Sequence, residues 1–303
     1  MKTHDIAVSV IVPTHNSRPG LDALLGWLRA QTLSNELYEV IVVDDGSRDG
    51  SAEMVQREHP WVRLIRQRRG GAYHARRTGV EASRGAMLAF TDADCVPSAD
   101  WLERGLAGVT DERLDLGAGR VDVSIANPGS VVERYDARFN LKQAYYATRA
   151  GFGVTANLFV SRAVYQRVGG FNASLYSGGD QKFCHDAITA GARLGYLPAA
   201  AVSHPARRTR RELMRKTVRV AKGRAQAFPS PHYYFPRLLS ALPAAYGDMR
   251  FASEPMGFKL RFIALHYWLE VIRIATYTGS RLKRFAAPAS EPVIGERPPN
   301  YED

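Results

Sequence analysis

The sequence predicts an α/β protein in which a parallel β-sheet is covered by helices on both faces. Short apolar runs rich in β-branched residues alternate with amphipathic stretches through about residue 125, and this βαβ alternation is typical of such a sheet. Three polar clusters directly follow three of the predicted strands: Thr14-His15-Asn16, Asp44-Asp45 and Asp92-Ala93-Asp94. Because ligands of open α/β sheets bind at the carboxyl ends of the strands, these clusters predict the place of a site.

Hydrophobic periodicity predicts the elements of this first half. The run AVSVIV at residues 7–12 stops at Pro13, as a buried strand does. Similar apolar runs predict strands at residues 39–43, 62–65 and 86–90. Between them, apolar residues at helical spacing predict helices at residues 21–30, 52–58 and 74–83.

In the second half of the chain, the sequence predicts fewer strands and more helices than in the first half. Residues 151–160 are expected to run from a loop into a short strand, and residues 162–168 to form a helix closed by two glycines. Another helix opens at residues 177–180, where Asp180 is either the N-cap, a favourable role for Asp, or a catalytic carboxylate. A strongly basic stretch follows at residues 207–224, and an amphipathic helix is expected at residues 258–285.

The composition excludes several classes of protein. Of the 303 residues, 45% are hydrophobic and 23% are charged, which is ordinary for a globular protein and excludes a disordered or collagenous chain. Two cysteines, Cys95 and Cys184, are too few for a disulfide framework. The 41 Lys and Arg against 30 Asp and Glu give a net charge of +11, which favours a polyanionic partner: nucleic acid, an anionic membrane face or a phosphorylated small molecule. With no signal-peptide pattern and no apolar run of about 18 residues, a cytoplasmic enzyme is the expectation.

Asp92 and Asp94 are separated by one residue and directly follow a predicted strand. From there they can direct oxygen ligands at one hard cation, and Mg²⁺ and Mn²⁺ accept carboxylates together with substrate phosphate oxygens. The alternative is that Asp92 caps the following helix or that both carboxylates are only solvated. The neighbouring cluster with Asp44 favours the metal site. The chain lacks both the P-loop and the Gly-x-Gly-x-x-Gly signature, which argues against those nucleotide sites.

Six segments follow one another over about residues 9–204: VSVIVPTHN, EVIVVDDGSRDGS, GGAYHARRTGVEAS, AFTDADCVP, TANLFVSRAVYQRVGGFN and SGGDQKFCHDAITAG. In their order and spacing they resemble glycosyltransferase family 2. The resemblance implies the Rossmann-like nucleotide-diphospho-sugar transferase fold, also called the A-type glycosyltransferase fold. It also implies inverting transfer of a sugar from a nucleotide-diphosphate sugar to a hydroxyl acceptor, with a divalent metal, Mn or Mg.

The same resemblance implies roles for individual residues. Seven residues would bind the nucleotide: Pro13, Thr14, Asn16, Asp44, Arg76, Asp92 and Ala93. Asp94 would hold the metal under the diphosphate, and His204 would either add a metal or diphosphate contact or be structural. Asp180 would be the general base, although Gly179 stands where the family usually carries a Glu. Asn157 would either touch a sugar hydroxyl or serve packing, and Cys95 is expected to be a small buried residue and not a nucleophile.

The resemblance also suggests how the chain is organised. Residues 1–205 would be the catalytic domain, with a nucleotide half at about 1–125 and an acceptor half at about 126–205. A basic and amphipathic helical extension would occupy residues 206–287, and a disordered tail residues 288–303.

The helical extension leaves two interpretations open for each of its parts. The basic stretch is either a solvated helix face or a surface for a diphosphate or anionic lipid, and the amphipathic helix either packs on the catalytic domain or lies at a membrane interface. The membrane interpretation predicts a peripheral enzyme on the inner face of the plasma membrane. There it would meet a lipid-linked or glycan acceptor in cell-envelope or polysaccharide synthesis.

Two other functions are consistent with the charge and the fold. A nucleic-acid-binding protein would explain the positive charge, but the chain has no zinc-finger spacing, aromatic RNA-binding signature or helix-turn-helix pattern. A nucleotidyltransferase of related fold would carry a glycine-rich phosphate-binding signature near its start, which is missing. We therefore expect a sugar transferase without a nucleic-acid partner.

Overall fold

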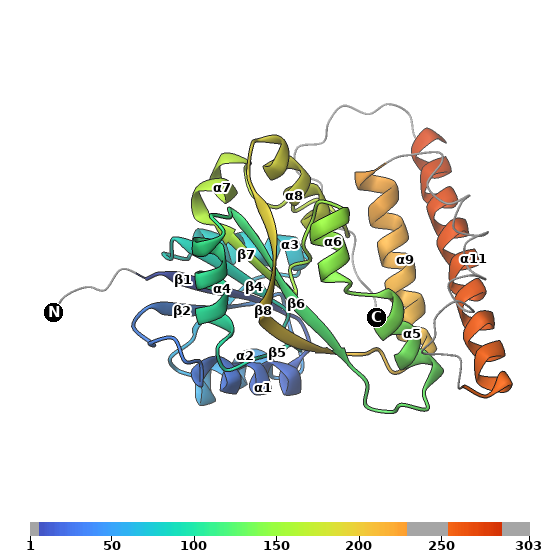
Figure 1. Ribbon diagram of the computed structural model, residues 1–303, viewed down its shortest axis with the longest axis horizontal. Coiled ribbons are helices and arrows are strands. Elements are labelled where there is room, and N and C mark those ends of the chain that lie inside the picture. The colour runs from blue at the N-terminus through green and yellow to red at the C-terminus, as the bar shows by residue number, and fades with distance from the viewer. Residues whose placement is uncertain (1–5, 229–253, 287–303) are drawn as a thin grey trace. The chain divides into compact units, whose positions relative to one another are not determined.

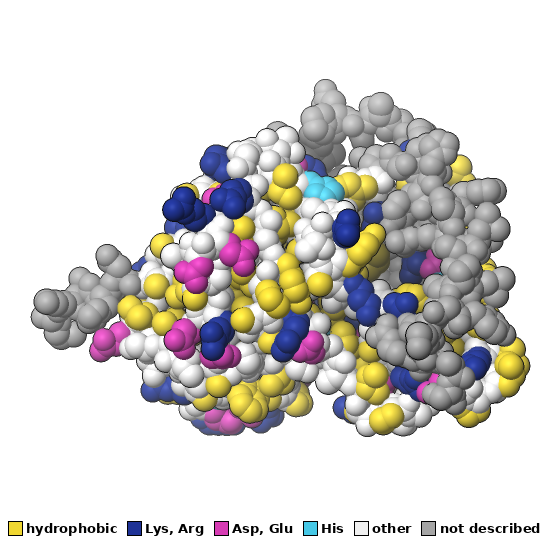
Figure 2. Space-filling view, in the orientation of Figure 1, with side chains coloured by type: hydrophobic (Ala, Val, Ile, Leu, Met, Phe, Trp, Pro, Cys, Tyr) yellow, Lys and Arg dark blue, Asp and Glu magenta, His cyan; other side chains and the backbone are white. Residues whose placement is uncertain are grey.

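The computed structural model describes residues 6–228 and 254–286, which fall into two compact units (Figure 1). Unit 1 comprises residues 1–124, 141–174 and 179–205, and unit 2 comprises residues 125–140, 175–178 and 206–303. The predicted tail at residues 288–303 lies outside the described residues. On the face of unit 1 drawn in Figure 2, acidic and basic side chains are interspersed.

The first half of unit 1 is the parallel sheet that the sequence predicts. Four strands form it: β1 (Val8–Thr14), β2 (Tyr38–Asp44), β3 (Arg63–Arg66) and β4 (Met87–Thr91). They lie in the order β3-β2-β1-β4, and every neighbouring pair is parallel. The connecting helices are α1 (Arg18–Arg29), α2 (Ser51–Glu58) and α3 (Ala72–Glu81).

Helices cover both faces of these strands, because the side chains of a strand alternate between the faces. Val8, Val10 and Val12 share one apolar core with the buried leucines of α1 and with α2. On the other face, a β-carbon added to Gly79 of α3 would lie 2.6 Å from Ile11, so α3 packs directly on β1. This double coverage explains why β1 and β2 are nearly continuous apolar runs.

The second half of the sheet is mixed and extends the parallel strands that the sequence predicts. Four strands continue it: β7 (Asn157–Ser161), β6 (Leu116–Ser124), β8 (Leu194–Pro205) and the short β5 (Val96–Pro97). β7 is antiparallel to both β4 and β6, β8 is parallel to β6, and β5 is antiparallel to β8. The described residues therefore form a mixed sheet of eight strands. The sequence did not predict β6, because its segment LGAGRVDVS combines small residues with polar ones at its exposed end.

Four further helices complete unit 1: α4 (Trp101–Asp111), α6 (Gln143–Arg149), α7 (Arg162–Arg167) and α8 (Gly179–Thr189). α7 and α8 confirm the helices expected at residues 162–168 and from residue 177 onward. Beside them, Phe171 contacts Phe90, Tyr165 and Phe183 in an aromatic cluster, with ring centroids 4.8 to 5.6 Å apart.

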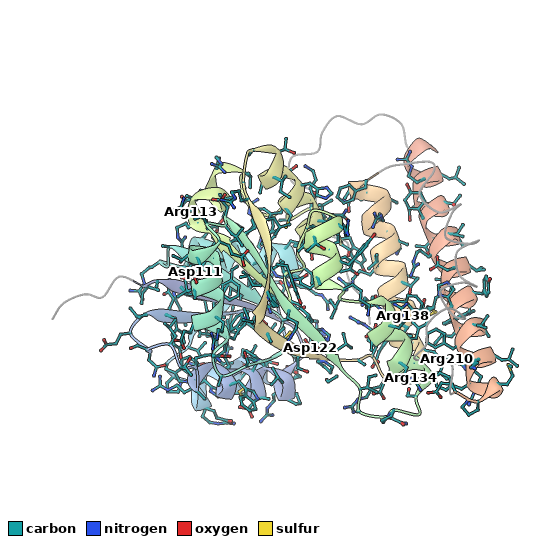
Figure 3. The ribbon with its side chains drawn as sticks, viewed as in Figure 1. Asp111, Arg113, Asp122, Arg134, Arg138 and Arg210 are labelled. Atoms are coloured by element: carbon teal, nitrogen blue, oxygen red, sulfur yellow. The ribbon has the colours of Figure 1, made fainter. Side chains whose placement is uncertain are left out.

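Unit 2 is built from three helices in the described part of the chain, α5 (Val131–Phe139), α9 (Arg210–Ala227) and α11 (Met256–Ala286). Arg134 and Arg138 lie on α5 and Arg210 opens α9 (Figure 3). Thr209 and Glu212 form a reciprocal capping box at the start of α9, which satisfies backbone donors that the first turn leaves free. The helix expected at residues 258–285 is thus present as α11. No helix of the described residues is long and apolar enough to cross a membrane.

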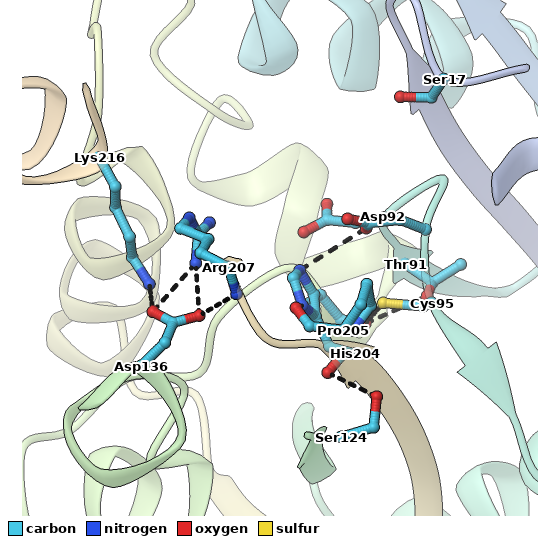
Figure 4. Close-up of polar contacts among 12 residues, drawn as sticks. Ser17, Thr91, Asp92, Cys95, Ser124, Asp136, His204, Pro205, Arg207 and Lys216 are labelled. Atoms are coloured by element: carbon cyan, nitrogen blue, oxygen red, sulfur yellow. Dashed lines mark hydrogen bonds and ion pairs between the residues drawn. The ribbon is translucent and has the colours of Figure 1, made fainter. Parts of the chain in front are cut away.

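A buried ion cluster ties α5 to α9 within unit 2. Asp136 of α5 is fully buried and accepts from the Arg207 backbone N–H at 3.0 Å and from its guanidinium at 3.1 Å, with Lys216 Nζ 3.5 Å away (Figure 4). Burial alone would raise the pKa of Asp136, but the charges of Lys216 and Arg207 hold that pKa below its ordinary value. Burial also lowers the pKa of Lys216 to about 7.

Candidate active site

The carboxyl ends of β1 and β2 bring two of the predicted nucleotide-binding residues into one row. Thr14 pairs with Asp44 in the parallel register, directly after Pro13 with Val43. Both Thr14 and Asp44 are buried, and Thr14 Oγ1 has no hydrogen-bond partner among the described residues. A buried hydroxyl without a partner is costly, so Thr14 is a candidate to meet a ligand atom at this edge.

Asn16 lies in the loop after β1 and connects it to the loop after β2. Its φ is +50°, its side-chain carbonyl accepts from the Arg48 N–H at 2.8 Å, and its own N–H donates to Ser47 Oγ at 3.0 Å. Asp44 Oδ1 accepts from the Ser47 N–H at 3.2 Å. These bonds fix the shape of both loops. In this structure the side chain of Asn16 therefore holds the two loops together.

Asp45 has a role that the sequence analysis missed. Its carboxylate accepts from the backbone N–H groups of Gly70 and Gly71, at 2.7 and 2.8 Å, and from the Gln67 side-chain amide at 2.7 Å. It therefore holds the loop that leads into α3. The Gly70-Gly71 pair at the start of a predicted helix was the available signal, because such a pair exposes two backbone donors to one carboxylate.

Arg76 and Asp92 form a largely buried ion pair. The Arg76 guanidinium donates to Asp92 Oδ1 at 2.6 Å, and it also lies over the ring of Tyr73, 5.7 Å from the ring centroid. Arg76 is buried on α3, whereas Asp92 follows β4 and is one-third exposed. Both residues are expected from the sequence to bind the nucleotide, and the fold brings them together.

Asp94 and His204 also lie close together, with His204 Nε2 3.6 Å from Asp94 Oδ1. His204 is buried near the end of β8, and its Nδ1 lies 2.8 Å from the Pro205 carbonyl oxygen. Since a carbonyl can only accept, Nδ1 is the donor in this contact, and Nε2 is directed towards the half-exposed Asp94. A histidine that donates through one ring nitrogen is oriented to bind a metal through the other.

Close backbone packing positions the segment that carries Ala93 and Asp94. A β-carbon added to Gly20 of α1 would lie 3.1 Å from the Ala93 carbonyl oxygen and 3.2 Å from Asp94 Cα. Any larger residue at position 20 would push this segment away. Ala93 itself is buried, so its approach to a ligand would be through the backbone.

The described residues contain no group of three or more His, Cys, Asp or Glu side chains arranged to hold a metal. Asp94 and His204 are therefore a two-ligand set, one hard oxygen and one imidazole nitrogen. Such a set fits Mn²⁺ or Mg²⁺ when substrate phosphate oxygens complete the shell, because these ions are often held by few protein ligands.

Asp180 lies in the first turn of α8, where the Tyr73 hydroxyl donates to its Oδ1 at 3.1 Å. Gly179 faces the same tyrosine: a β-carbon there would lie 2.8 Å from the Tyr73 ring. The ring thus occupies the space that a glutamate at position 179 would need. The presence of the Tyr73 ring and the absence of a Glu at position 179 are therefore complementary: the ring fills the space that the Glu side chain would need.

Asn157 and Cys95 are both buried inside the fold. Asn157 is fully buried, accepts from the Trp101 indole at 2.9 Å and donates to the carbonyls of Arg120 and Ala200 at 2.8 and 2.9 Å. This is the packing role of the two alternatives. Cys95 is buried as expected, and burial raises the pKa of its thiol.

Comparison with known proteins decides the family. The chain matches the model of glycosyl transferase family 2 over residues 9–169. The chain belongs to this family. Among its family relatives, glycosyltransferase AglE of Haloferax volcanii is 38% identical over 225 residues, which cover 73% of this chain and 74% of AglE. The pre-mycofactocin glycosyltransferase of Mycobacterium tuberculosis is 32% identical over 206 residues, which cover 65% of this chain and 42% of that protein.

Solved structures support the same fold. The mannosyltransferase PcManGT from Pyrobaculum calidifontis, in complex with GDP-Man and Mn²⁺, aligns with a TM-score of 0.57 and 21% identity over 95% of this chain and 77% of that one. S. aureus TarS 1–349 in complex with UDP-GlcNAc aligns with a TM-score of 0.55 and 18% identity over 93% of this chain and 92% of that one. The family 2 chain therefore has the predicted A-type glycosyltransferase fold.

Proposed function

We propose that this glycosyltransferase is a metal-dependent inverting enzyme that moves a sugar from a nucleotide-diphosphate sugar to a hydroxyl acceptor. One observation carries the proposal: a continuous chain of contacts runs from Asp180 through Tyr73 and Arg76 to Asp92. It connects the candidate base to the acidic segment at the end of β4. All four residues belong to unit 1.

The nucleotide is proposed to lie at the carboxyl ends of β1, β2 and β4. The partnerless hydroxyl of Thr14 and the buried carboxylate of Asp44 supply polar groups at this edge, with Pro13, Asn16, Arg76, Asp92 and Ala93 as the surrounding residues. That PcManGT was solved with GDP-Man and TarS with UDP-GlcNAc supports a nucleotide-sugar donor here.

Asp94 and His204 Nε2 are proposed to hold the divalent metal. When bound, the metal would neutralise the negative charge that develops on the departing nucleoside diphosphate. The Mn²⁺ bound to PcManGT supports this choice of cation. The His204 ring needs no rotation for this role, because its Nδ1 already faces the Pro205 carbonyl oxygen and its Nε2 faces Asp94.

Asp180 is proposed as the general base. An acceptor hydroxyl must lose its proton as it attacks the anomeric carbon, and a carboxylate within hydrogen-bond reach contributes about 10²–10⁴-fold. Attack from the side opposite the leaving group inverts the anomeric centre. Tyr73 holds one carboxylate oxygen of Asp180, which leaves the other oxygen for the acceptor.

We propose a lipid-linked or glycan acceptor, reached from the cytoplasmic side of the membrane in cell-envelope or polysaccharide synthesis. The many Lys and Arg residues of α9 in unit 2 support the proposal that the enzyme acts at an anionic surface.

A donor panel tests the proposed function. The full chain is incubated with nucleotide-diphosphate sugars and Mn²⁺, Mg²⁺ or EDTA, and release of the nucleoside diphosphate is measured. We expect release with one donor, loss of release in EDTA, and an inverted anomer as the first product seen by NMR. Thermal stabilisation by oligonucleotides, with none by any nucleoside diphosphate plus metal, would contradict the proposal.

A further inference from the structure

The ring of His15 makes three polar contacts at the carboxyl end of β1. Its Nδ1 lies 3.0 Å from the Asp45 carbonyl oxygen, and its Nε2 lies 2.6 Å from Arg69 Nη1 and 3.2 Å from Asn16 Nδ2. Arg69 comes from the loop between β3 and α3, 54 positions after His15. Neither His15 nor Arg69 is among the residues proposed above to bind the nucleotide.

The chemistry of the three partners fixes the state of the His15 ring. A carbonyl oxygen can only accept a hydrogen bond, and a guanidinium can only donate one. The Asn16 amide is oriented as well: its oxygen accepts from the Arg48 backbone N–H at 2.8 Å, so its nitrogen is the atom that faces His15. The neutral ring with its proton on Nδ1 satisfies all three contacts together. Through Nε2, His15 therefore accepts from Arg69.

Arg69 crosses from the end of β2 to the end of β1. Its backbone lies against Gly46, where an added β-carbon would lie 3.3 Å from the Arg69 nitrogen and 3.6 Å from Arg69 Cβ. Asp45 holds the following two residues of the same loop through their backbone N–H groups. From this anchored backbone the exposed Arg69 reaches the ring of His15. Because neighbouring strands are about 4.8 Å apart, its guanidinium lies at the edge of the sheet where β1 and β2 end.

The nucleotide is proposed to bind at this same edge, and the inference rests on that proposed function. The proposed metal ligand Asp94 follows β4, which lies beside β1 on the side away from β2. A nucleotide that has its diphosphate at Asp94 and extends across β1 and β2 brings its base to these two strands. The guanidinium of Arg69 therefore faces the base and not the diphosphate.

A guanidinium in this position distinguishes two classes of nucleobase. It carries five N–H donors in a rigid plane and no acceptor, so Arg69 can bond to His15 and to a second acceptor at the same time. Guanine, uracil and thymine present a keto oxygen at the position where adenine and cytosine present an amino group. The keto oxygen accepts from Arg69, whereas the amino group sets donor against donor.

We propose that Arg69, held in place by His15, is a specificity-determining residue that selects a sugar donor with a keto nucleobase. Arg69 donates to the base, and His15 is a positioning residue that acts through Arg69. A neutral imidazole suits this role because it orients the guanidinium without neutralising its charge. The selected donors are guanosine, uridine and thymidine diphosphate sugars, and the excluded donors are those of adenosine and cytidine.

Calorimetric titration of the full chain with nucleoside diphosphates and Mn²⁺ tests the proposal. Two matched pairs isolate the base, UDP against CDP and IDP against ADP, since the members of a pair differ only in the keto or amino group and the adjoining ring nitrogen. We expect the keto member of the better-bound pair to bind at least about tenfold tighter. Arg69→Met keeps the apolar stem but loses the donors, so it should lower that ratio about tenfold.

The ratio of the two dissociation constants separates base selection from a general loss of charge or of fold. Arg68→Met removes an exposed cation from the same loop and should leave the ratio within about twofold, because a charge that touches no base acts alike on both members of a pair. His15→Phe keeps an aromatic ring without its nitrogens and should lower the ratio as Arg69→Met does. In the Arg69→Met background His15→Phe should lower it no further, since residues that act through one contact are not additive.

Three results would overturn this inference alone. One is that the chain binds these nucleotides without preferring the keto member of either pair. Another is that Arg69→Met keeps the full preference. The third is that His15→Phe lowers the ratio equally with and without Arg69, which would mean that His15 does not act through it. Binding of none of the four nucleotides would overturn the proposed function together with the inference.

Discussion

The hydroxyl of Tyr73 donates to Asp180 Oδ1 across 3.1 Å, and the ring of the same tyrosine fills the space in front of Gly179. One aromatic side chain from α3 therefore both orients the candidate base on α8 and excludes the acid that commonly precedes it. Tyr73 is itself held by Phe171, 5.8 Å away between ring centroids, and by the Arg76 guanidinium. A helix of the parallel half of unit 1 thus contributes the residue that orients the candidate base.

Tyr73→Phe should lower kcat about 10- to 100-fold while leaving the donor KM nearly unchanged. The substitution keeps the ring and its packing but removes a hydrogen bond to a carboxylate, which is worth about 1.5–3 kcal/mol. Steady-state kinetics with the identified donor measure both constants. Tyr165→Phe is the matched control, since it removes a buried tyrosine hydroxyl of the neighbouring aromatic cluster, and its activity should stay near that of the unchanged chain. A raised donor KM with unchanged kcat for Tyr73→Phe would contradict a role in positioning the base.

Gly179→Glu should destabilise unit 1, and the double variant Tyr73→Ala/Gly179→Glu should recover part of that loss. Overpacking a close contact costs about 1–3 kcal/mol, and removing the ring opens the space that the new side chain needs. Urea unfolding of the two single variants and the double variant gives the coupling between the positions. Gly26→Ala on α1 is the control, because nothing lies within 4 Å of a β-carbon there. Strictly additive effects would show that Tyr73 is not what excludes a side chain at position 179.

The parallel half of the fold could be predicted from the sequence because its strands are buried on both faces. Strands such as β1 then appear as unbroken β-branched runs, and the helices between them carry one clear apolar face. β6 could not be predicted in the same way. From Arg120 to Ser124 exposed and half-buried positions alternate, and polar residues mix with valines, so no continuous apolar run marks the strand.

In the candidate site, too, some residues could be predicted from the sequence and others could not. Residues at strand ends, such as Asp44 and Asp94, could be predicted because topology brings strand ends together. The partners Tyr73 and Asp180 are 107 positions apart, and nothing local in either segment indicates their contact. Asp136 was missed for the same reason: its partners Arg207 and Lys216 come from the basic stretch, which by itself resembles a solvated helix face.

Asp94→Ala should abolish stabilisation of the chain by a nucleoside diphosphate plus Mn²⁺ and leave the fold intact. The side chain is half-exposed and contributes little packing, while its carboxylate is one of the two proposed metal ligands. Thermal shift with nucleotide, with and without Mn²⁺, measures the effect. Asp111→Ala removes an exposed acid at the end of α4 and should behave like the unchanged chain. Full Mn²⁺-dependent stabilisation of Asp94→Ala would remove Asp94 from the metal site.

Asp180→Asn should keep donor affinity and lose transfer by about 10²–10⁴-fold, the contribution of a general base. The amide fills the same space and still accepts from Tyr73, but it cannot take a proton. Donor binding by calorimetry and transfer by product release separate the two effects. Asp186→Asn, on the same helix and paired with Lys182 at the surface, should retain transfer. Loss of donor affinity in Asp180→Asn would instead assign Asp180 to binding.

Asp136→Asn should destabilise the protein by about 3–5 kcal/mol near pH 7, because Arg207 and Lys216 lose their buried counter-ion. The difference from the unchanged chain should shrink with acid. The native pKa of Asp136 lies below its ordinary value, so the ionised carboxylate contributes its stabilisation above the unfolded pKa of about 3.9. It loses that contribution as the pH falls through the native pKa. Urea unfolding between pH 3 and 7, at the same ionic strength throughout, measures the gap at each pH. Asp122→Asn, which breaks an exposed pair with Arg120, should change stability by less than about 1 kcal/mol at every pH. A gap for Asp136→Asn that stays constant down to pH 3 would mean that its carboxylate is not held ionised by these two cations.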